Sequence, residues 1–425
     1  MRVLISGAGI AGPTLAYFLA KTGARVTVLD RSRDLLRQGQ NVDVGHSAVA
    51  VIRKMGLMNE LRRWNTTEKG TRILDDRGKT LASFPLREGS LASPTSEFEV
   101  LRGDLAWLIH GATRDAPKKN VEYLFGTTAK RVISNDDRAV KVELSDGQVR
   151  EFDLLVVADG QRSALRAQCF PEEAVTMVDK DMYVVYATIP RVPGDDDWWN
   201  VFFALGSRIV TLRPDPHGTI RAMVTKMPLD ENQRAAWRAA AAKGGDRAAQ
   251  QELVRREFEG AGWQVGRVLD GMEAAPDYYF QAVEQVRMER WSAGRVVCLG
   301  DAAHAPSPLT GMGASLAITG AYVLAGELSG LREGEHPTRA LEEFERKFRP
   351  FVEEVQKIPS MFPGSAHPAT PLQRWMLHAA LSTMDWVLGR VSSMPWMQRK
   401  FLNDETTEDT DFPLPKYPKL EASGL

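Results

Sequence analysis

Three glycines near the N-terminus have the spacing of a phosphate-binding turn. The pattern Gly-x-Gly-x-x-Gly is formed by Gly7, Gly9 and Gly12. The apolar run Val3–Ser6 precedes it and predicts a strand, and the stretch Pro13–Thr22 after it has helical periodicity. Such a turn lets backbone amides at a helix N-terminus approach a pyrophosphate. Asp30 closes the next predicted strand and can accept hydrogen bonds from ribose hydroxyls, so these residues predict a dinucleotide site without separating FAD from NAD.

Two later carboxylates also follow apolar runs that are typical of buried strands. Asp159 and Gly160 come directly after Leu154–Ala158. Gly300 and Asp301 come after Val296–Leu299, at the start of a loop rich in glycine and proline. Ligands of open α/β sheets bind at the carboxyl ends of strands, and a helix that begins near Ala314 would add free amides there. The candidate ligand contacts of this loop are Pro308, Gly311, Gly313 and Ala314.

The elements that must position these residues indicate an α/β fold. Strand, glycine-rich turn, helix and strand follow one another at the N-terminus, as in a parallel sheet. We expect a Rossmann-like dinucleotide-binding domain from residues 1–70, 100–170 and 285–335. A β-rich substrate domain from 71–99 and 171–284 would interrupt it, and 336–425 would be a helical C-terminal region.

Several helices are expected outside the glycine motif. Among them, periodic apolar residues predict one over Val51–Arg63, one over Glu97–Thr113 and one over Leu372–Val391. The last carries Leu372, Trp375, Met376 and further apolar residues on one face. That face would either cover the substrate site or pack on a core.

Composition excludes several classes of protein. The 425 residues are 43% hydrophobic and 26% charged, with a net charge of −1, so nothing draws the chain to nucleic acid. No apolar run is long enough for a membrane span. The two cysteines, Cys169 and Cys298, give no disulfide framework and favour a reducing compartment, so we expect a cytoplasmic protein. Seven scattered histidines, His304 included, lack ligand spacing, and no metal site is expected.

Taken together over residues 1–350, the three motifs resemble the class A flavoprotein monooxygenases, the family of para-hydroxybenzoate hydroxylase. The resemblance implies that the glycine turn and Asp30 bind the ADP part of FAD. It implies that Asp159 and Gly160 serve FAD and the nicotinamide cofactor, and that Gly300 and Asp301 bind the ribityl chain and pyrophosphate. Arg102, in Leu-Arg-Gly-Asp-Leu, fits a further FAD contact of this family.

Two segments are most similar to the branch of tetracycline-inactivating enzymes and polyketide hydroxylases. They are Asn41–Val44, with Asp43 near the flavin ring, and the stretch from Pro308 to Ala325. The sequence departs from that branch at Gly45-His46, where Arg-Gly is commoner. No second glycine fingerprint is present for a nicotinamide domain, and the Trp-x-Trp-x-Ile-Pro signature of flavin halogenases is absent.

The resemblance implies hydroxylation of a small phenolic, enolic or polyketide-like substrate with NADPH or NADH and O2, through a flavin C4a-hydroperoxide. Arg213 and Tyr186, in the β-rich part, are candidates for positioning the substrate and pairing with its anionic form. The chain would be a monomer or homodimer. The alternatives are epoxidation, Baeyer–Villiger oxidation or reduction on the same fold, or a flavin-binding or ligand-binding protein without catalysis.

Overall fold

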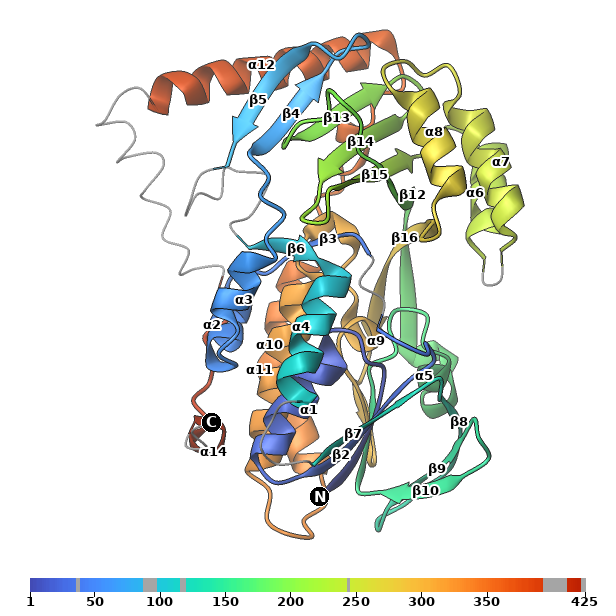
Figure 1. The fold of residues 1–425 in the computed structure, drawn as a ribbon. Coiled ribbons are helices and arrows are strands. Elements are labelled where there is room, and N and C mark those ends of the chain that lie inside the picture. The colour runs from blue at the N-terminus through green and yellow to red at the C-terminus, as the bar shows by residue number, and fades with distance from the viewer. Residues whose placement is uncertain (36–38, 87–97, 115–119, 243–244, 393–410, 422–425) are drawn as a thin grey trace.

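Two large β-sheets organise the chain, and each has its own set of covering helices (Figure 1). The computed structural model describes residues 1–35, 39–86, 98–114, 120–242, 245–392 and 411–421. The expected α/β class, with a Rossmann-like unit and a β-rich unit, is confirmed. The exact domain boundaries stay a prediction.

The first sheet is six-stranded, in the order β17-β18-β11-β1-β2-β7. Its centre is parallel: β1 (Arg2–Ser6) pairs with both β2 (Arg25–Asp30) and β11 (Leu154–Val157), and β11 pairs with β18 (Val296–Cys298). The edges are β7 (Val121–Phe125) and the short β17 (Ser292–Ala293). This order brings the ends of the strands that precede the three sequence motifs side by side.

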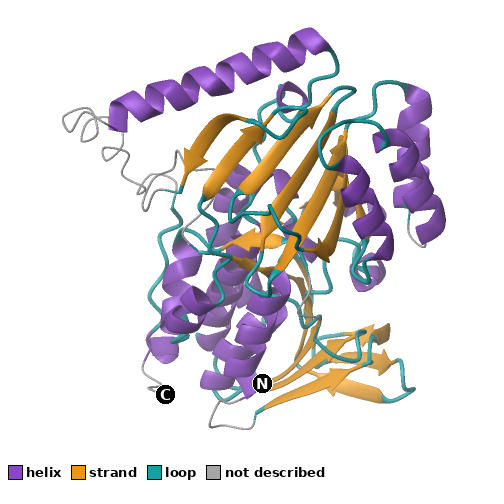
Figure 2. Ribbon diagram, turned by 45° about the horizontal axis from the view of Figure 1, so that its top comes forward, coloured by secondary structure: helices purple, strands orange, loops and turns teal. Residues whose placement is uncertain are grey.

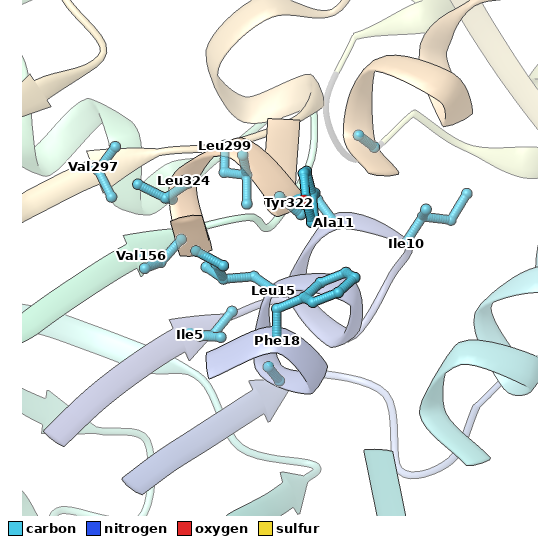
Figure 3. Close-up of a cluster of buried hydrophobic side chains, with 14 of the residues drawn as sticks. Ile5, Ile10, Ala11, Leu15, Phe18, Val156, Val297, Leu299, Tyr322 and Leu324 are labelled. Carbon is cyan, nitrogen blue, oxygen red and sulfur yellow. The ribbon is translucent and has the colours of Figure 1, made fainter. Parts of the chain in front are cut away.

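Helices α1 (Ala11–Lys21) and α10 (Gly313–Ser329) lie beside this sheet. Leu15 and Phe18 of α1 are fully buried, because the strands are apolar on the face that the helix covers. Figure 3 shows them together with Ile5 and Val156 of the sheet and Tyr322 of α10. Helix α11 (Thr338–Val355) packs against α10 on its other side. A separate three-stranded sheet of β8 (Ala129–Asn135), β9 (Val140–Leu144) and β10 (Val149–Phe152) follows β7.

The second sheet is seven-stranded and mainly antiparallel, in the order β16-β12-β15-β14-β13-β4-β5 (Figure 2). Its strands are β4 (Gly70–Leu74), β5 (Thr80–Pro85), β12 (Val175–Pro190), β13 (Trp199–Ala204), β14 (Arg208–Pro214), β15 (Thr219–Lys226) and β16 (Tyr279–Met288). One face is buried under α6 (Glu231–Ala241), α7 (Arg247–Phe258) and α8 (Val265–Ala274).

Two of the expected helices have different bounds in the structure. The segment expected as Val51–Arg63 forms α2 (Ser47–Lys54) and α3 (Met58–Arg63), because Gly56 between them has a φ of +76° that a helix does not contain. In the segment expected as Glu97–Thr113, residues Glu99–Leu101 form strand β6, and helix α4 runs from Arg102 to Arg114. Strand β6 pairs with β3 (Asn41–Asp43), which places Glu99 directly opposite Asp43.

The C-terminal helix α12 (Pro371–Ser392) exists as expected, but most of the apolar face predicted for it is exposed, and of its three packed leucines Leu388 alone belongs to that face. Leu372, Trp375 and Met376 are 66%, 67% and 57% exposed. Leu377, Leu381 and Leu388 instead pack on the second sheet, and Figure 1 shows α12 crossing β4 and β5. Residues 393–410 lie outside the described part. After them, the chain is again beside the Rossmann-like unit, where α14 (Pro418–Glu421) packs on α10.

Among the described residues, no helix combines the length and apolarity that crossing a membrane would need.

Candidate functional site

The glycine turn between β1 and α1 has no room for larger side chains at two of its three positions. A Cβ atom on Gly7 would lie 2.2 Å from the carbonyl oxygen of Ala158, and one on Gly12 would lie 2.0 Å from the carbonyl oxygen of Gly7. Gly7 also has a φ of +118°. Ile10, at the N-cap position of helix α1, provides no side-chain cap, so the first amides of the helix are free for an anionic ligand. These features fit a pyrophosphate.

Asp30 lies at the end of β2 and already accepts two backbone hydrogen bonds. Its Oδ2 accepts from the amide of Ala8 at 2.9 Å, and its Oδ1 accepts from the amide of Ser32 at 2.8 Å. Each carboxylate oxygen has a further lone pair that can accept a ribose hydroxyl. The carboxylate is therefore fixed beside the glycine turn, in the place where the sequence prediction requires it.

Arg102 lies beside the remaining glycine of the turn, and its charge acts on Asp301. Arg102 is the first residue of α4, and its Nη2 atom lies 3.8 Å from the Cβ position of Gly9. Asp301 begins the short helix α9 (Asp301–His304), after Gly300 with a φ of +63°. Burial raises the pKa of Asp301, and the nearby Arg102 guanidinium opposes that rise. The first and third motifs are thus joined at one place, with a cation for phosphates and a carboxylate for hydroxyls.

The loop from Gly300 to Ala314 closes this site on the side of α10. The 3-10 turn Pro308–Thr310 ends at Gly311 in the left-handed conformation, with a φ of +66°. Helix α10 then starts at Gly313 without a side-chain cap, so the amides from Gly313 and Ala314 onward lie at a positive helix end. Asp301 Oδ1 lies 3.8 Å from the Cβ position of Gly313.

Asp43 lies next to this loop. Its Oδ2 atom is 3.3 Å from the Cβ position of Gly311, and its backbone carbonyl accepts a hydrogen bond from Ser315 Oγ at 3.3 Å. Ser315 Oγ also accepts from the amide of Gly45 at 3.1 Å. His46, where the sequence departs from its relatives, has a φ of +56°, which is uncommon for a residue with a side chain. The segment 43–46 is therefore held against the start of α10.

Asp159 and Gly160 lie at the end of β11, beside the glycine turn. Gly7 contacts the backbone of Ala158 and Asp159. Burial raises the pKa of Asp159, while a hydrogen bond with Ser163 opposes the rise. Ser163 caps α5 (Ala164–Cys169) by accepting from the amide of Arg166 at 2.9 Å. The second motif thus joins the other two at one edge of the parallel sheet.

Replacing Asp301 by alanine is expected to weaken FAD binding by about tenfold to a hundredfold, because one or two hydrogen bonds to ligand hydroxyls are lost. Apparent FAD affinity can be measured by fluorescence quenching on titrating the apoprotein. The thermal stability of the apoprotein serves as the control and should hardly change, since the Asp301 carboxylate makes no hydrogen bond to the described residues of the chain. Full FAD affinity in Asp301→Ala would show that this carboxylate does not contact the cofactor.

The second sheet presents its open face toward this site. We call this the substrate face and define it by Tyr186, Trp199, Thr211, Arg213, Arg221 and Met223, which lie on the side of the sheet opposite α6–α8. Tyr186, Met223 and Leu309 of the α9–α10 loop pack against one buried cluster, Met182, Val184 and Val283. The substrate face is therefore continuous with the loop that closes the expected FAD site.

Arg213 lies at the centre of a buried charge cluster that the sequence did not reveal. Its Nε and Nη2 atoms donate to the two carboxylate oxygens of Glu68 at 2.6 and 2.8 Å, and Nη2 also pairs with Glu99. The guanidinium carbon stacks over the Trp199 ring, 4.1 Å from its centre. Arg213, which was predicted to pair with an anionic substrate, is thus already paired with two carboxylates of the protein.

Burial is the main electrostatic effect on the side chains of this region. It raises the pKa of Glu99 well above its ordinary value, with Arg213 opposing and Glu68 and Asp43 adding to the rise. It also raises the pKa of Tyr186, which disfavours the phenolate form of this side chain. Tyr186 is placed as a hydrogen-bond donor on the substrate face, and its role in positioning the substrate stays a prediction.

Helix α12 covers the same sheet face at its β5 edge, which in the sheet order β14-β13-β4-β5 is the end away from the strand of Arg213. Its inner leucines pack on a buried cluster that includes Ile73, Phe84 and Phe203. Ser382 Oγ donates to the carbonyl of Leu81 at 3.1 Å, and Asp385 accepts from the amide of Ser83 at 3.2 Å. The helix thus extends the apolar surroundings of the substrate face.

The described residues contain no group of three or more His, Cys, Asp or Glu side chains arranged to hold a metal. His304 is buried against Trp291 and Phe348, and burial lowers its pKa to about 3. Cys298 is buried in β18 and Cys169 is half-buried in α5, and neither is in a disulfide.

Known proteins with similar sequences indicate the family of this chain. Residues 1–358 match the family model described as FAD binding domain. An FAD-dependent monooxygenase of Sarocladium schorii is 30% identical over 450 aligned residues, which cover 99% of each chain. A flavin-dependent monooxygenase of a Phoma species is 36% identical over 376 aligned residues, which cover 83% of this chain and 84% of the relative.

Solved structures show the same fold. The tetracycline destructase Tet(51) superposes with a TM-score of 0.77 at 24% identity, over 98% of this chain and 99% of its own. HpxO of Klebsiella pneumoniae, in complex with FAD and uric acid, gives a TM-score of 0.67 at 20% identity, over 90% and 93% of the two chains. The uncapped helices and the glycine turn fit the cofactor that these relatives use. The chain belongs to the class A flavoprotein monooxygenases and is an FAD-dependent enzyme.

Proposed function

We propose that this monooxygenase hydroxylates a small, electron-rich phenolic, enolic or polyketide-like substrate, with NADPH or NADH as reductant and O2 as the oxygen source. One observation carries the proposal: the substrate face combines aromatic and aliphatic side chains with polar atoms that have no partner. Among the described residues, Thr211 Oγ1 and Trp199 Nε1 are buried without a hydrogen-bond partner. A ring system with hydroxyl or carbonyl groups at its edge matches this combination.

Bound FAD, once reduced, supplies the oxygen-activating chemistry that the side chains of the protein lack. Gly7, Gly12, Arg102 and Asp301 would hold its phosphates and hydroxyls, and the amides at the start of α10 would face its negative charge. The chain's own contribution is then to orient the substrate and to keep water away from the reacting atoms.

Orientation and water exclusion come from different elements. Tyr186, Met223 and Leu309 pack against the same buried cluster, so a ring that packs on the first two would lie near the loop beside the cofactor. The inner leucines of α12 extend the apolar surface on the other side. The tetracycline destructases show the same fold with 98% coverage of this chain, which favours a polycyclic substrate here.

The test is a panel of phenols and polycyclic polyketides scored by NADPH and NADH oxidation. We expect slow oxidation without substrate and an increase of about tenfold or more with a suitable phenol or enol, a lowering of the barrier by about 1.4 kcal/mol. Asp301→Ala, which weakens the cofactor site, is the control for turnover outside this site. Rapid oxidation that no compound changes would contradict the proposal, and a reduced product without added oxygen would indicate a reductase.

A further inference from the structure

Both arginines of the substrate face are held by carboxylates from two different segments. The partners of Arg213 are Glu68, between α3 and β4, and Glu99 of β6. The side chains of these two glutamates are 2% and 3% exposed, and that of Arg213 is 16% exposed. Asp43, opposite Glu99 across the β3–β6 pair, also acts on the guanidinium. The single positive charge therefore faces carboxyl groups from three segments.

Arg221 repeats this arrangement on the neighbouring strand. It lies opposite Arg213 in the β14–β15 register, so both side chains are on the same face. Its Nε atom donates to Asp215 Oδ2 at 3.0 Å, and Nη1 lies 3.3 Å from Asp277 Oδ2. The side chains of Arg221 and Asp277 are each 10% exposed, and that of Asp215 is fully buried. A second cation is thus matched by two carboxylates.

The pairing of arginines with carboxylates determines the net charge that the substrate face presents to a ligand. Each arginine contributes one positive charge and each pair of carboxyls contributes up to two negative charges. The group of Arg213, Glu68 and Glu99 is neutral when Glu99 keeps its proton and negative when it does not, and Asp43 can only make the cluster more negative. Neither cluster therefore has a net positive charge. A ligand carboxylate that is desolvated on this face would not be compensated by Arg213 or Arg221, because both are already paired.

None of the partnerless polar atoms around this face carries a positive charge. Among the described residues, these atoms are one carboxyl oxygen of the Arg213 cluster, Glu99 Oε2, the Trp199 indole N–H, and the hydroxyls of Thr71 and Thr211. The indole and the hydroxyls can bind hydroxyl and carbonyl oxygens without requiring charge. From both observations we infer that the enzyme selects uncharged polycyclic ligands and discriminates against ligands with a carboxylate, and that the two arginine–carboxylate clusters set this preference. The inference rests on the proposed function, since it concerns the substrate of that same site.

The test compares two dihydroxyanthraquinones, danthron and rhein, which differ only by a carboxylate on rhein. Their binding to the FAD-loaded enzyme is measured by calorimetry at a pH where the carboxylate is ionised. We expect rhein to bind at least tenfold more weakly than danthron. Glu68→Gln and Asp277→Asn each remove one negative charge with little change of shape, so each should reduce this ratio severalfold.

Asp181→Asn is the matched control, because Asp181 pairs with Arg234 of α6, away from the substrate face, and the ratio should stay unchanged. The two test variants alter different clusters. If one of them does not fold, the binding ratio of the other still tests the inference. Equal or tighter binding of rhein, or a ratio that neither variant changes, would overturn the inference while leaving the proposed function in place. Failure of both compounds to bind would overturn the inference together with the proposed polycyclic substrate.

Discussion

The variant Gly12→Val is expected to lose FAD, and its Rossmann-like unit is expected to be less stable than in the wild type. A Cβ atom at residue 12 would lie 2.0 Å from the carbonyl oxygen of Gly7 and 3.1 Å from the Ile5 side chain. Because backbone and a buried strand residue cannot move aside, helix α1 must shift from β1. We expect a loss of about 3 kcal/mol or more in the free energy of unfolding, measured with denaturant.

The matched control is Gly111→Ala in α4, where an added Cβ would have no neighbour within 4 Å. That change should keep FAD and leave stability equal or higher by up to about 1 kcal/mol, since alanine favours a helix. A Gly12→Val protein that purified with a full complement of FAD and normal stability would show that the turn does not pack as described.

The second large effect is expected from Arg213→Leu. Removing the guanidinium leaves Glu68 and Glu99 buried together without a cation. Their side chains are nearly inaccessible to water, so solvent cannot replace the lost interaction. Breaking one side of a buried ion pair typically costs about 3–5 kcal/mol, whereas replacing the whole group by neutral residues costs much less. We therefore expect severe destabilisation of the single variant and substantial recovery in the triple variant Glu68→Gln, Arg213→Leu, Glu99→Gln.

The defect should also depend on pH in a defined direction. Burial raises the pKa of Glu99 in the folded protein, so the folded state holds this proton more tightly than the unfolded state. Its contribution is present below the unfolded pKa, about 4.3, and is lost as the pH rises through the folded value. Arg213 opposes the raised pKa, so the single variant should lose stability more steeply with rising pH than the wild type. Equal slopes for the two proteins would contradict this account of the cluster.

The cofactor side of the molecule could be predicted from sequence because its signals are local. A glycine that has no room for a side chain, a carboxylate at a strand end and an apolar run are each visible in a few residues. The parallel order of β1, β11 and β18 then brings these segments together, and Asp30, Asp159 and Asp301 lie at one edge of the sheet. Arg102 could be found only through its motif, because its reach to Gly9 depends on the packing of α4.

The substrate side could not be predicted in the same way. The partners of Arg213 come from segments more than a hundred residues earlier in the chain. Glu99 lies in strand β6, which the apolar periodicity of Glu97–Thr113 led us to predict as part of a helix. Helix α12 has apolar residues on both faces, so periodicity alone could not select the buried one. The structure buries Leu377 and Leu381 and leaves Trp375 exposed, because polar contacts such as Ser382 to Leu81 fix the rotation of the helix.

The most direct test of the central claim follows the oxygen atom. The FAD-loaded enzyme is supplied with NADPH and a substrate from the panel that stimulates its oxidation, once under isotopically labelled O2 in ordinary water and once under ordinary O2 in labelled water. Mass spectrometry of the product should show one labelled atom in the first reaction and none in the second. A label that comes from water, or a product without added oxygen, would contradict assignment of this chain as a hydroxylating monooxygenase.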